Sequence, residues 1–152
     1  MHNKTFEYTI YIAADRKRIW EALTSKEATT QYFFKREVQS DWKEGSTVRY
    51  VTETGELDVE GEILKVIPFE TLCFTWRHAE DHSNRTEPTM VTFSLKSLEE
   101  TTKLTVEHSN LLETDWSDDK NTFYGLNNGW PAIMSNLKSY LEIGKTMPPM
   151  NI

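Results

Sequence analysis

The sequence predicts an α+β fold: a curved antiparallel sheet of six to seven strands around a long C-terminal helix, with two short helices after the first strand. Two patterns predict it. Apolar and polar residues alternate in short segments from residue 5 to residue 109, which is typical of half-buried strands. From Trp130 onward the apolar residues recur at helical spacing instead. A sheet with one apolar face needs a cover, and this helix is the only predicted element long enough.

The first predicted strand and the two short helices come from the first 34 residues. Apolar side chains alternate with others over residues 5–12, and Asp15 follows as a candidate N-cap. The helix after Asp15 carries Ile19, Trp20 and Leu23 on one side. The segment 24–27, Thr-Ser-Lys-Glu, has the spacing of a capping box, which predicts a second short helix towards Phe33.

The middle of the chain predicts a meander of strands. Short turns separate the segments, two of them around Gly45 and Gly55, and a polar stretch at 79–87 reads as a hairpin loop. Strands joined by short turns are antiparallel, because parallel pairs need long crossovers. The expected strands are 38–42, 47–52, 57–66, 72–77, 91–96 and 103–109.

The C-terminal helix is predicted from a single apolar stripe. Its members lie at i, i+3, i+4, i+7 and i+11, and they are Trp130, Ile133, Met134, Leu137 and Leu141. Gly144 is the expected end of the helix. Pro131 leaves two starting points: the helix begins there, or a helix from about Asn121 passes through it with a kink.

Length and composition favour a single domain spanning 1–152. The formal net charge of −7 disfavours nucleic acid as a partner. Cys73 is the only cysteine, so no intramolecular disulfide forms, which fits a reducing compartment. The first residues hold no apolar signal-peptide core. No stretch approaches the ~20 apolar residues of a membrane span. The cytoplasm is therefore the expected location.

No motif points to catalysis, a cofactor or a metal ion. Neither Gly-x-Ser-x-Gly nor a glycine-rich phosphate loop occurs. His78 and His82 are four residues apart, but the segment 79–84 between and after them reads as a loop rather than a helix, so a solvated loop is the better interpretation. Cys73 has no evident base to activate it. We expect no catalytic residue, no metal ligand and no cofactor.

The inward-facing residues are candidates for lining an apolar cavity. They come from the small helices, the central strands and the stripe of the last helix, and a solid core is the alternative interpretation. Among them, His108 lies on the apolar face of the last strand, where a hydrogen-bonded core histidine is the commoner case. The candidate ligand-binding residues are Trp20, Phe33, Tyr50, Phe74, Trp76, Phe93, His108, Trp130, Met134 and Leu137.

Several motifs in sequence order resemble a known family. They are Ile19–Thr24, Tyr32–Phe34, Trp42–Ser46, Pro68–Trp76, Gly129–Trp130 and Leu137–Leu141. Together they resemble the START-like helix-grip superfamily, and more narrowly the branch named after the C-terminal domain of the activator of the Hsp90 ATPase. One departure is Tyr-Phe-Phe at 32–34, where relatives often carry Trp followed by an aromatic residue.

The resemblance implies a helix-grip fold and leaves three functions open. The first is non-catalytic binding of an apolar, lipid-like or aromatic small molecule between sheet and helix. The second is an interaction module that stimulates a chaperone ATPase of the Hsp90 type. The third is a cyclase-like enzyme that uses the same cavity, with His108 or a buried tyrosine as acid or base. The oligomeric state stays open.

Overall fold

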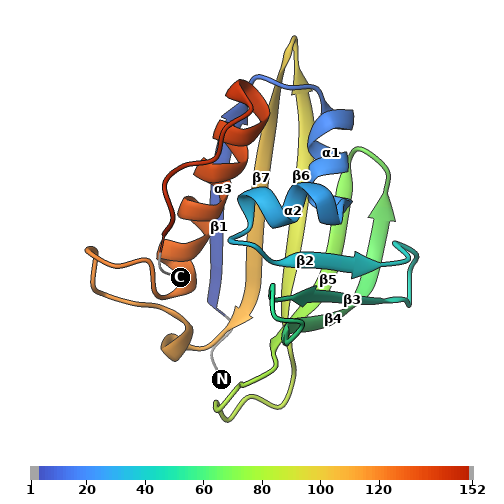
Figure 1. Cartoon of the computed structure of the whole chain (residues 1–152). Coiled ribbons are helices and arrows are strands. Elements are labelled where there is room, and N and C mark those ends of the chain that lie inside the picture. The colour runs from blue at the N-terminus through green and yellow to red at the C-terminus, as the bar shows by residue number, and fades with distance from the viewer. Residues whose placement is uncertain (1–3, 151–152) are drawn as a thin grey trace.

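A computed structural model describes residues 4–150 of the chain. Two α-helices follow the first strand, six strands come next, and a long helix is the last element, as Figure 1 shows. The elements are β1 (Lys4–Ile12), α1 (Arg16–Thr24), α2 (Lys26–Tyr32), β2 (Glu37–Ser40), β3 (Thr47–Val51), β4 (Leu57–Ile67), β5 (Thr71–His78), β6 (Thr89–Leu98), β7 (Thr101–Leu111), a 3-10 turn η1 (Glu113–Asp115) and α3 (Leu126–Ile143).

The strands within residues 4–150 form one antiparallel sheet of seven, in the order β1-β7-β6-β5-β4-β3-β2. Consecutive strands from β2 to β7 are neighbours, as short turns require. In Figure 1 the β2–β4 end of the sheet turns across the direction of β6 and β7, so the sheet curves around α3. The predicted fold class and strand number are confirmed.

The starts of the short helices follow from two caps. Asp15 accepts a hydrogen bond from the backbone N–H of Arg18 at 2.8 Å, as the sequence predicts. The second cap is Ser25, whose hydroxyl accepts from the N–H of Ala28. The prediction of a cap at Thr24 is wrong by one residue, because the Thr24 hydroxyl instead donates to the carbonyl of Trp20 in the last turn of α1.

Two other boundaries differ from the expected ones. Strand β2 ends at Ser40 rather than Trp42, because Trp42 has a φ of 56° and leaves the extended region. Helix α3 begins at Leu126, between the two expected starting points, and continues through Pro131. It ends at Gly144, as predicted, where the N–H of Gly144 donates to the carbonyl of Tyr140.

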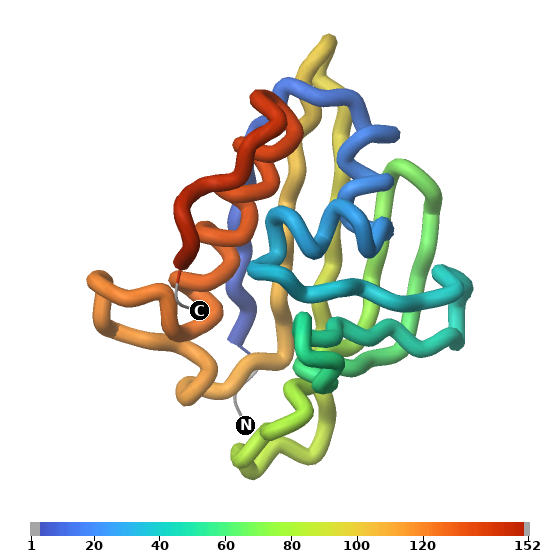
Figure 2. The backbone as a smooth tube through the Cα atoms, viewed as in Figure 1, coloured from blue at the N-terminus to red at the C-terminus, as the bar shows by residue number. Residues whose placement is uncertain are grey.

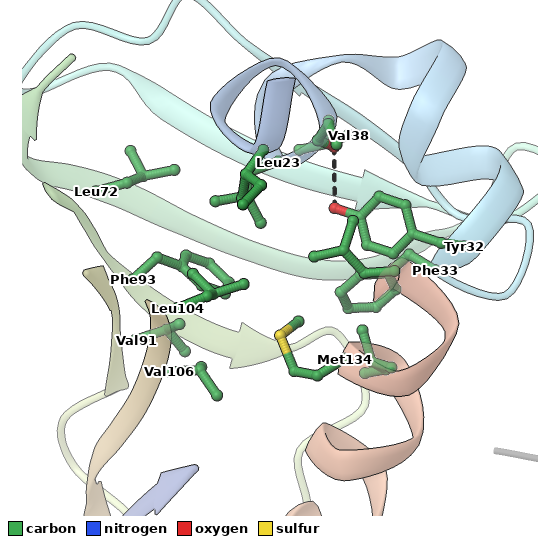
Figure 3. Packing of buried hydrophobic residues seen from close by; sticks show 14 of the residues in the cluster. Leu23, Tyr32, Phe33, Val38, Leu72, Val91, Phe93, Leu104, Val106 and Met134 are labelled. Atoms are coloured by element: carbon green, nitrogen blue, oxygen red, sulfur yellow. Dashed lines mark hydrogen bonds between the residues drawn. The ribbon is translucent and has the colours of Figure 1, made fainter. Parts of the chain in front are cut away.

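The centre between sheet and helix is filled with side chains. Phe74 and Phe93 of the sheet and Leu137 of α3 are fully buried. Figure 3 shows Met134 pointing from α3 toward Val106 and the neighbouring sheet residues. Each Å² of apolar surface removed from water contributes about 25 cal/mol, so burial of one such side chain stabilises the fold by about 2 kcal/mol. Any space for a guest therefore lies away from this centre.

None of the helices within residues 4–150 is both long enough and apolar enough to cross a membrane.

Candidate functional site

A pocket of about 440 Å³ lies at one end of the sheet, between β5–β7 and the first turns of α3. Figure 2 shows the two segments beside it, the β5–β6 loop and the chain from 112 to 125, at the end of the sheet away from α1. The exposed lining residues mark its mouth, and they are His78, Thr114, Phe123 and Tyr124. The lining consists of Phe33, Arg36, Asp58, Trp76, His78, Asp81, Arg85, Thr89, His108, Leu111, Thr114, Asp115, Phe123, Tyr124, Gly125, Leu126, Gly129, Trp130 and Ile133.

Three aromatic rings form the inner wall of the pocket. Phe33 follows directly after α2, Trp76 is on β5, and Trp130 is in the second turn of α3. The ring centroids of Trp76 and Trp130 are 5.4 Å apart, and the Phe33 ring meets Trp130 edge-on at 6.2 Å. Rings at these distances stabilise one another and present flat apolar surfaces. The wall suits a flat, apolar guest.

His108 holds this wall through a chain of hydrogen bonds. The Trp130 indole N–H donates to Nδ1 of His108 at 3.0 Å. Since Nδ1 accepts, the neutral ring carries its proton on Nε2, which lies 2.6 Å from the Thr89 hydroxyl oxygen. The Thr89 hydroxyl donates in turn to the carbonyl of Trp76 at 2.8 Å. Both ring nitrogens of His108 are therefore engaged.

Burial keeps the imidazole of His108 neutral. Removal from water lowers its pKa to about 3, and the nearby charge of Asp115 only partly opposes this effect. Protonation would also place a positive charge on the nitrogen that accepts the indole N–H. At neutral pH the side chain is a fixed acceptor and donor, so it is poorly suited to accept or release a proton during a reaction.

A buried guanidinium lies on the polar side of the pocket. The side chain of Arg85, from the β5–β6 loop, is only 8% exposed. Its Nε–H donates to Asp81 at 2.7 Å, and Nη2 donates to Asp115 in η1. The Ser83 backbone and hydroxyl lower the pKa of Asp81 to about 2, with Arg85 contributing. Although burial lowers the pKa of Arg85, hydrogen bonds and charge from the two aspartates raise it above its ordinary value.

A second ion pair lies at the rim. Arg36, in the connection after α2, donates from Nε to Asp58 on β4, and both side chains are part-buried. The sequence predicts Asp58, Glu60 and Glu62 as a solvated outer row. That prediction is wrong for Asp58, which lines the pocket: the register of β3 and β4 shifts here and leaves Asp58 without a partner residue on β3, and its carboxylate pairs with Arg36.

The structure brings four of the ten predicted ligand-binding residues together around the pocket. These are Phe33, Trp76, His108 and Trp130. The other six belong to the hydrophobic core and do not line the pocket: Trp20, Tyr50, Phe74, Phe93, Met134 and Leu137. Period-two and helical patterns identify inward-facing residues, but they do not say where along the sheet the packing stops. A ligand-binding role for any of the ten stays a prediction.

Three smaller expectations concern the surroundings of the pocket. His78 and His82 are exposed at the end of β5 and in the following loop. Within residues 4–150, no group of three or more His, Cys, Asp or Glu side chains is placed to hold a metal ion. The order of predicted elements also suggests that the two small helices close the mouth of a cavity, and this expectation is wrong: of residues 16–33, only Phe33 lines the pocket.

Sequence reasoning missed the charged half of the site. Asp81 and Arg85 carry only a weak local signal, because they are opposite charges four residues apart within one loop. Asp115 is thirty residues further along, so only the three-dimensional fold brings it to Arg85. The same holds for Arg36 and Asp58, which are joined across 22 residues.

The curved sheet, the helix that it surrounds and the pocket at one end of the sheet together define a START-like helix-grip protein. Within that class, the chain belongs to the Activator of Hsp90 ATPase homolog 1-like family, whose model matches residues 13–142. No curated protein matches the chain at a significant level.

Solved structures agree with this assignment. The chain is similar to Aha1 from Colwellia psychrerythraea, solved as a dimer in solution, with a TM-score of 0.72 and 27% identity over 93% of this chain and 98% of that one. CalU16 from Micromonospora echinospora shares the fold, with a TM-score of 0.73 and 19% identity over 97% and 80% of the two chains. An HSP90 activator from Plasmodium falciparum gives a TM-score of 0.69 and 20% identity over 92% and 96%.

Proposed function

We propose that this protein binds a flat, apolar small molecule in the pocket at the start of α3, without covalent chemistry. The observation that carries the proposal is the wall formed by Phe33, Trp76 and Trp130 beside a space of about 440 Å³. Small-molecule pockets fall in the range of roughly 300–1,000 Å³ and are lined mainly by apolar and aromatic side chains with a few fixed polar groups.

The state of His108 supports binding rather than catalysis. Its two ring nitrogens are occupied by Trp130 and Thr89, and burial lowers its pKa to about 3. Tyr32 and Tyr50 are fully buried, and burial raises the pKa of each phenol well above 10. Neither tyrosine lines the pocket. The groups expected to serve as acid or base are therefore poorly placed to move protons.

Gly129 offers a way to test the pocket without disturbing the core. It lines the pocket from α3, and a Cβ built there meets only the carbonyl oxygen of Phe123, at 3.8 Å. Gly129→Leu should place a branched side chain in the pocket. Gly129→Ala is the matched control, since it adds one methyl group and should stabilise the helix by about 0.5–1 kcal/mol.

The experiment titrates 2-isopropenylnaphthalene into each protein and follows the indole N–H resonance of Trp130 by NMR. We expect saturable binding to the unaltered protein, at least about tenfold weaker binding to Gly129→Leu because of steric overlap, and a smaller change for Gly129→Ala. Thermal unfolding of each variant confirms that it is folded. Equal affinity for all three proteins, or no saturable binding to the unaltered one, would contradict the proposal.

Stimulation of an Hsp90-type ATPase is a second candidate, favoured by family membership. The Plasmodium falciparum relative is described as an HSP90 activator. The test measures ATP hydrolysis by a purified Hsp90 at saturating amounts of this protein. An increased rate that survives Gly129→Leu would assign a chaperone function separate from the pocket. An unchanged rate would remove this candidate.

A further inference from the structure

Arg85 has one donor group that the protein does not use. Of its three nitrogens, Nε pairs with Asp81 and Nη2 with Asp115, whereas the buried Nη1 has no hydrogen-bond acceptor within residues 4–150. A buried charged donor without a partner is costly. Arg85 lines the pocket, its side chain is more than nine-tenths buried, and Nη1 itself is closed off from solvent, so an acceptor on a guest reaches Nη1 when a small movement of the lining opens this group.

The charge of the lining decides what kind of acceptor fits. Two guanidinium groups, of Arg36 and Arg85, line the pocket together with the three carboxylates of Asp58, Asp81 and Asp115. Each guanidinium already has a carboxylate partner, and the lining has a net charge of −1 with the histidines neutral. A carboxylate or phosphate would enter against this charge with little water to screen it. A neutral acceptor avoids that repulsion.

The position of the unused donor fixes the layout of the guest. Arg85 comes from the β5–β6 loop, whereas Trp76 and Trp130 build the aromatic wall from β5 and α3. One end of a guest can therefore lie on the rings while its other end reaches the guanidinium. Salt bridges to two aspartates from different loops hold that guanidinium in place before the guest arrives.

We propose that the unused Nη1 group of Arg85 is a recognition site that selects, among flat apolar guests, those with an uncharged carbonyl-type oxygen. This inference rests on the proposed binding function and adds the polar part of the ligand. A carbonyl oxygen accepts from Nη1 while the ring system lies against the aromatic wall. Hydrogen bonds to a charged donor discriminate strongly, because an analogue without the acceptor leaves the donor unpaired.

The test compares three probes of one ring system. 2-Acetylnaphthalene carries the carbonyl, 2-isopropenylnaphthalene has a CH₂ group in place of the oxygen, and 2-naphthoate carries a charged carboxylate. Each is titrated into the unaltered protein and into Arg85→Lys. The ammonium of lysine keeps a positive charge between the two aspartates. It has a single nitrogen, however, so the separate Nη1 donor is lost. The ratio of ketone to alkene affinity cancels differences in general hydrophobicity when the two proteins are compared.

We expect Arg85→Lys to lower the ketone-to-alkene affinity ratio at least about tenfold, the size of one charge-assisted hydrogen bond. Naphthoate should bind the unaltered protein more weakly than the ketone. A second readout needs no variant: the side-chain ¹⁵N resonances of Arg85 should shift when the ketone binds and not when the alkene binds. If Arg85→Lys does not fold, the NMR readout on the unaltered protein still decides the question.

Different failures point to different claims. Equal ratios in both proteins, with no Arg85 shift on ketone binding, would overturn the Arg85 inference while leaving pocket binding intact. Tighter binding of naphthoate than of the ketone would overturn the choice of a neutral acceptor. If no probe binds, the proposed function fails and the inference fails with it.

Discussion

At the scale of single residues, His108 joins α3 to the sheet through bonds that run in one direction. Trp130 donates to His108, which donates to Thr89, which donates to the carbonyl of Trp76. Each buried polar atom in this series of hydrogen bonds has its partner. Such a network specifies one arrangement of the rings, because any other rotation leaves a buried group unpaired.

His108 should make the protein less stable in acid. Its pKa is about 3 in the folded state and near 6.5 when unfolded, so the unfolded chain binds more protons between these values. The free energy of unfolding should fall as pH drops from 6.5 towards 3, by up to about 1.4 kcal/mol per pH unit from this residue. Gln can replace both hydrogen-bonding roles without titrating, so His108→Gln should lose this part of the slope.

Chemical denaturation at a series of pH values measures the effect. The exposed His82→Gln is the matched control and should keep the slope of the unaltered protein. Identical slopes in His108→Gln and the unaltered protein would mean that His108 is not held neutral by burial.

Gly61 is needed for a different reason, the close approach of two strands. A Cβ at this position of β4 would lie 1.7 Å from the carbonyl oxygen of Thr75 on β5. We predict that Gly61→Ala lowers the free energy of unfolding by at least about 2 kcal/mol, because backbone must move. At Gly55 an added Cβ has no neighbour within 4 Å, but the backbone φ is 89°. Gly55→Ala should therefore lower the free energy of unfolding by only about 1 kcal/mol. Urea denaturation compares the two, and equal losses would refute the crowding argument.

At the scale of elements, Asn136 of α3 ties three segments together. Its amide N–H donates to the carbonyl of Tyr32 at the end of α2, and its oxygen accepts from the N–H of Met147 after α3. The side chain is buried. The clip fixes α2 on α3, and hence the position of Phe33, which follows Tyr32 and lines the pocket.

Asn136→Leu should remove this clip while keeping the side-chain volume. Two backbone groups lose their partners, so we expect a loss of about 2–3 kcal/mol in the free energy of unfolding. The N–H of Met147 should also exchange faster with solvent hydrogen. Asn121→Leu, at an exposed position, should change stability by no more than about 0.5 kcal/mol. Unchanged stability and exchange in Asn136→Leu would show that the clip contributes little.

Local sequence signals predicted the elements well and their ends less well. The cap at Asp15 and the stop at Gly144 need only neighbouring residues, so the sequence reveals them. Helix α3 crosses Pro131, since packing of Trp130 and Ile133 against the sheet outweighs the local preference. The cap at Ser25 rather than Thr24 is a choice between adjacent hydroxyls, which the pattern alone does not make.

At the scale of the whole molecule, the pocket lies where the packing between sheet and helix ends. Bulky residues such as Phe74 and Leu137 fill the middle of the grip, and space remains where the β5–β6 loop and segment 112–125 meet α3. Hydrophobic patterning predicted the sheet, the covering helix and the inward residues. Hydrophobic patterning could not predict the ion pair between Arg85 and Asp115, because that contact depends on how two loops far apart in sequence meet.

Locating a bound probe tests the central claim, that this end pocket takes an apolar guest. Intermolecular NOEs between 2-isopropenylnaphthalene and the labelled protein report which side chains contact the rings. The account predicts contacts with Leu111, Trp130 and Ile133, all of which line the pocket. Contacts confined to exposed apolar residues elsewhere, such as Leu64 and Phe69, or no contacts at saturating probe, would contradict it.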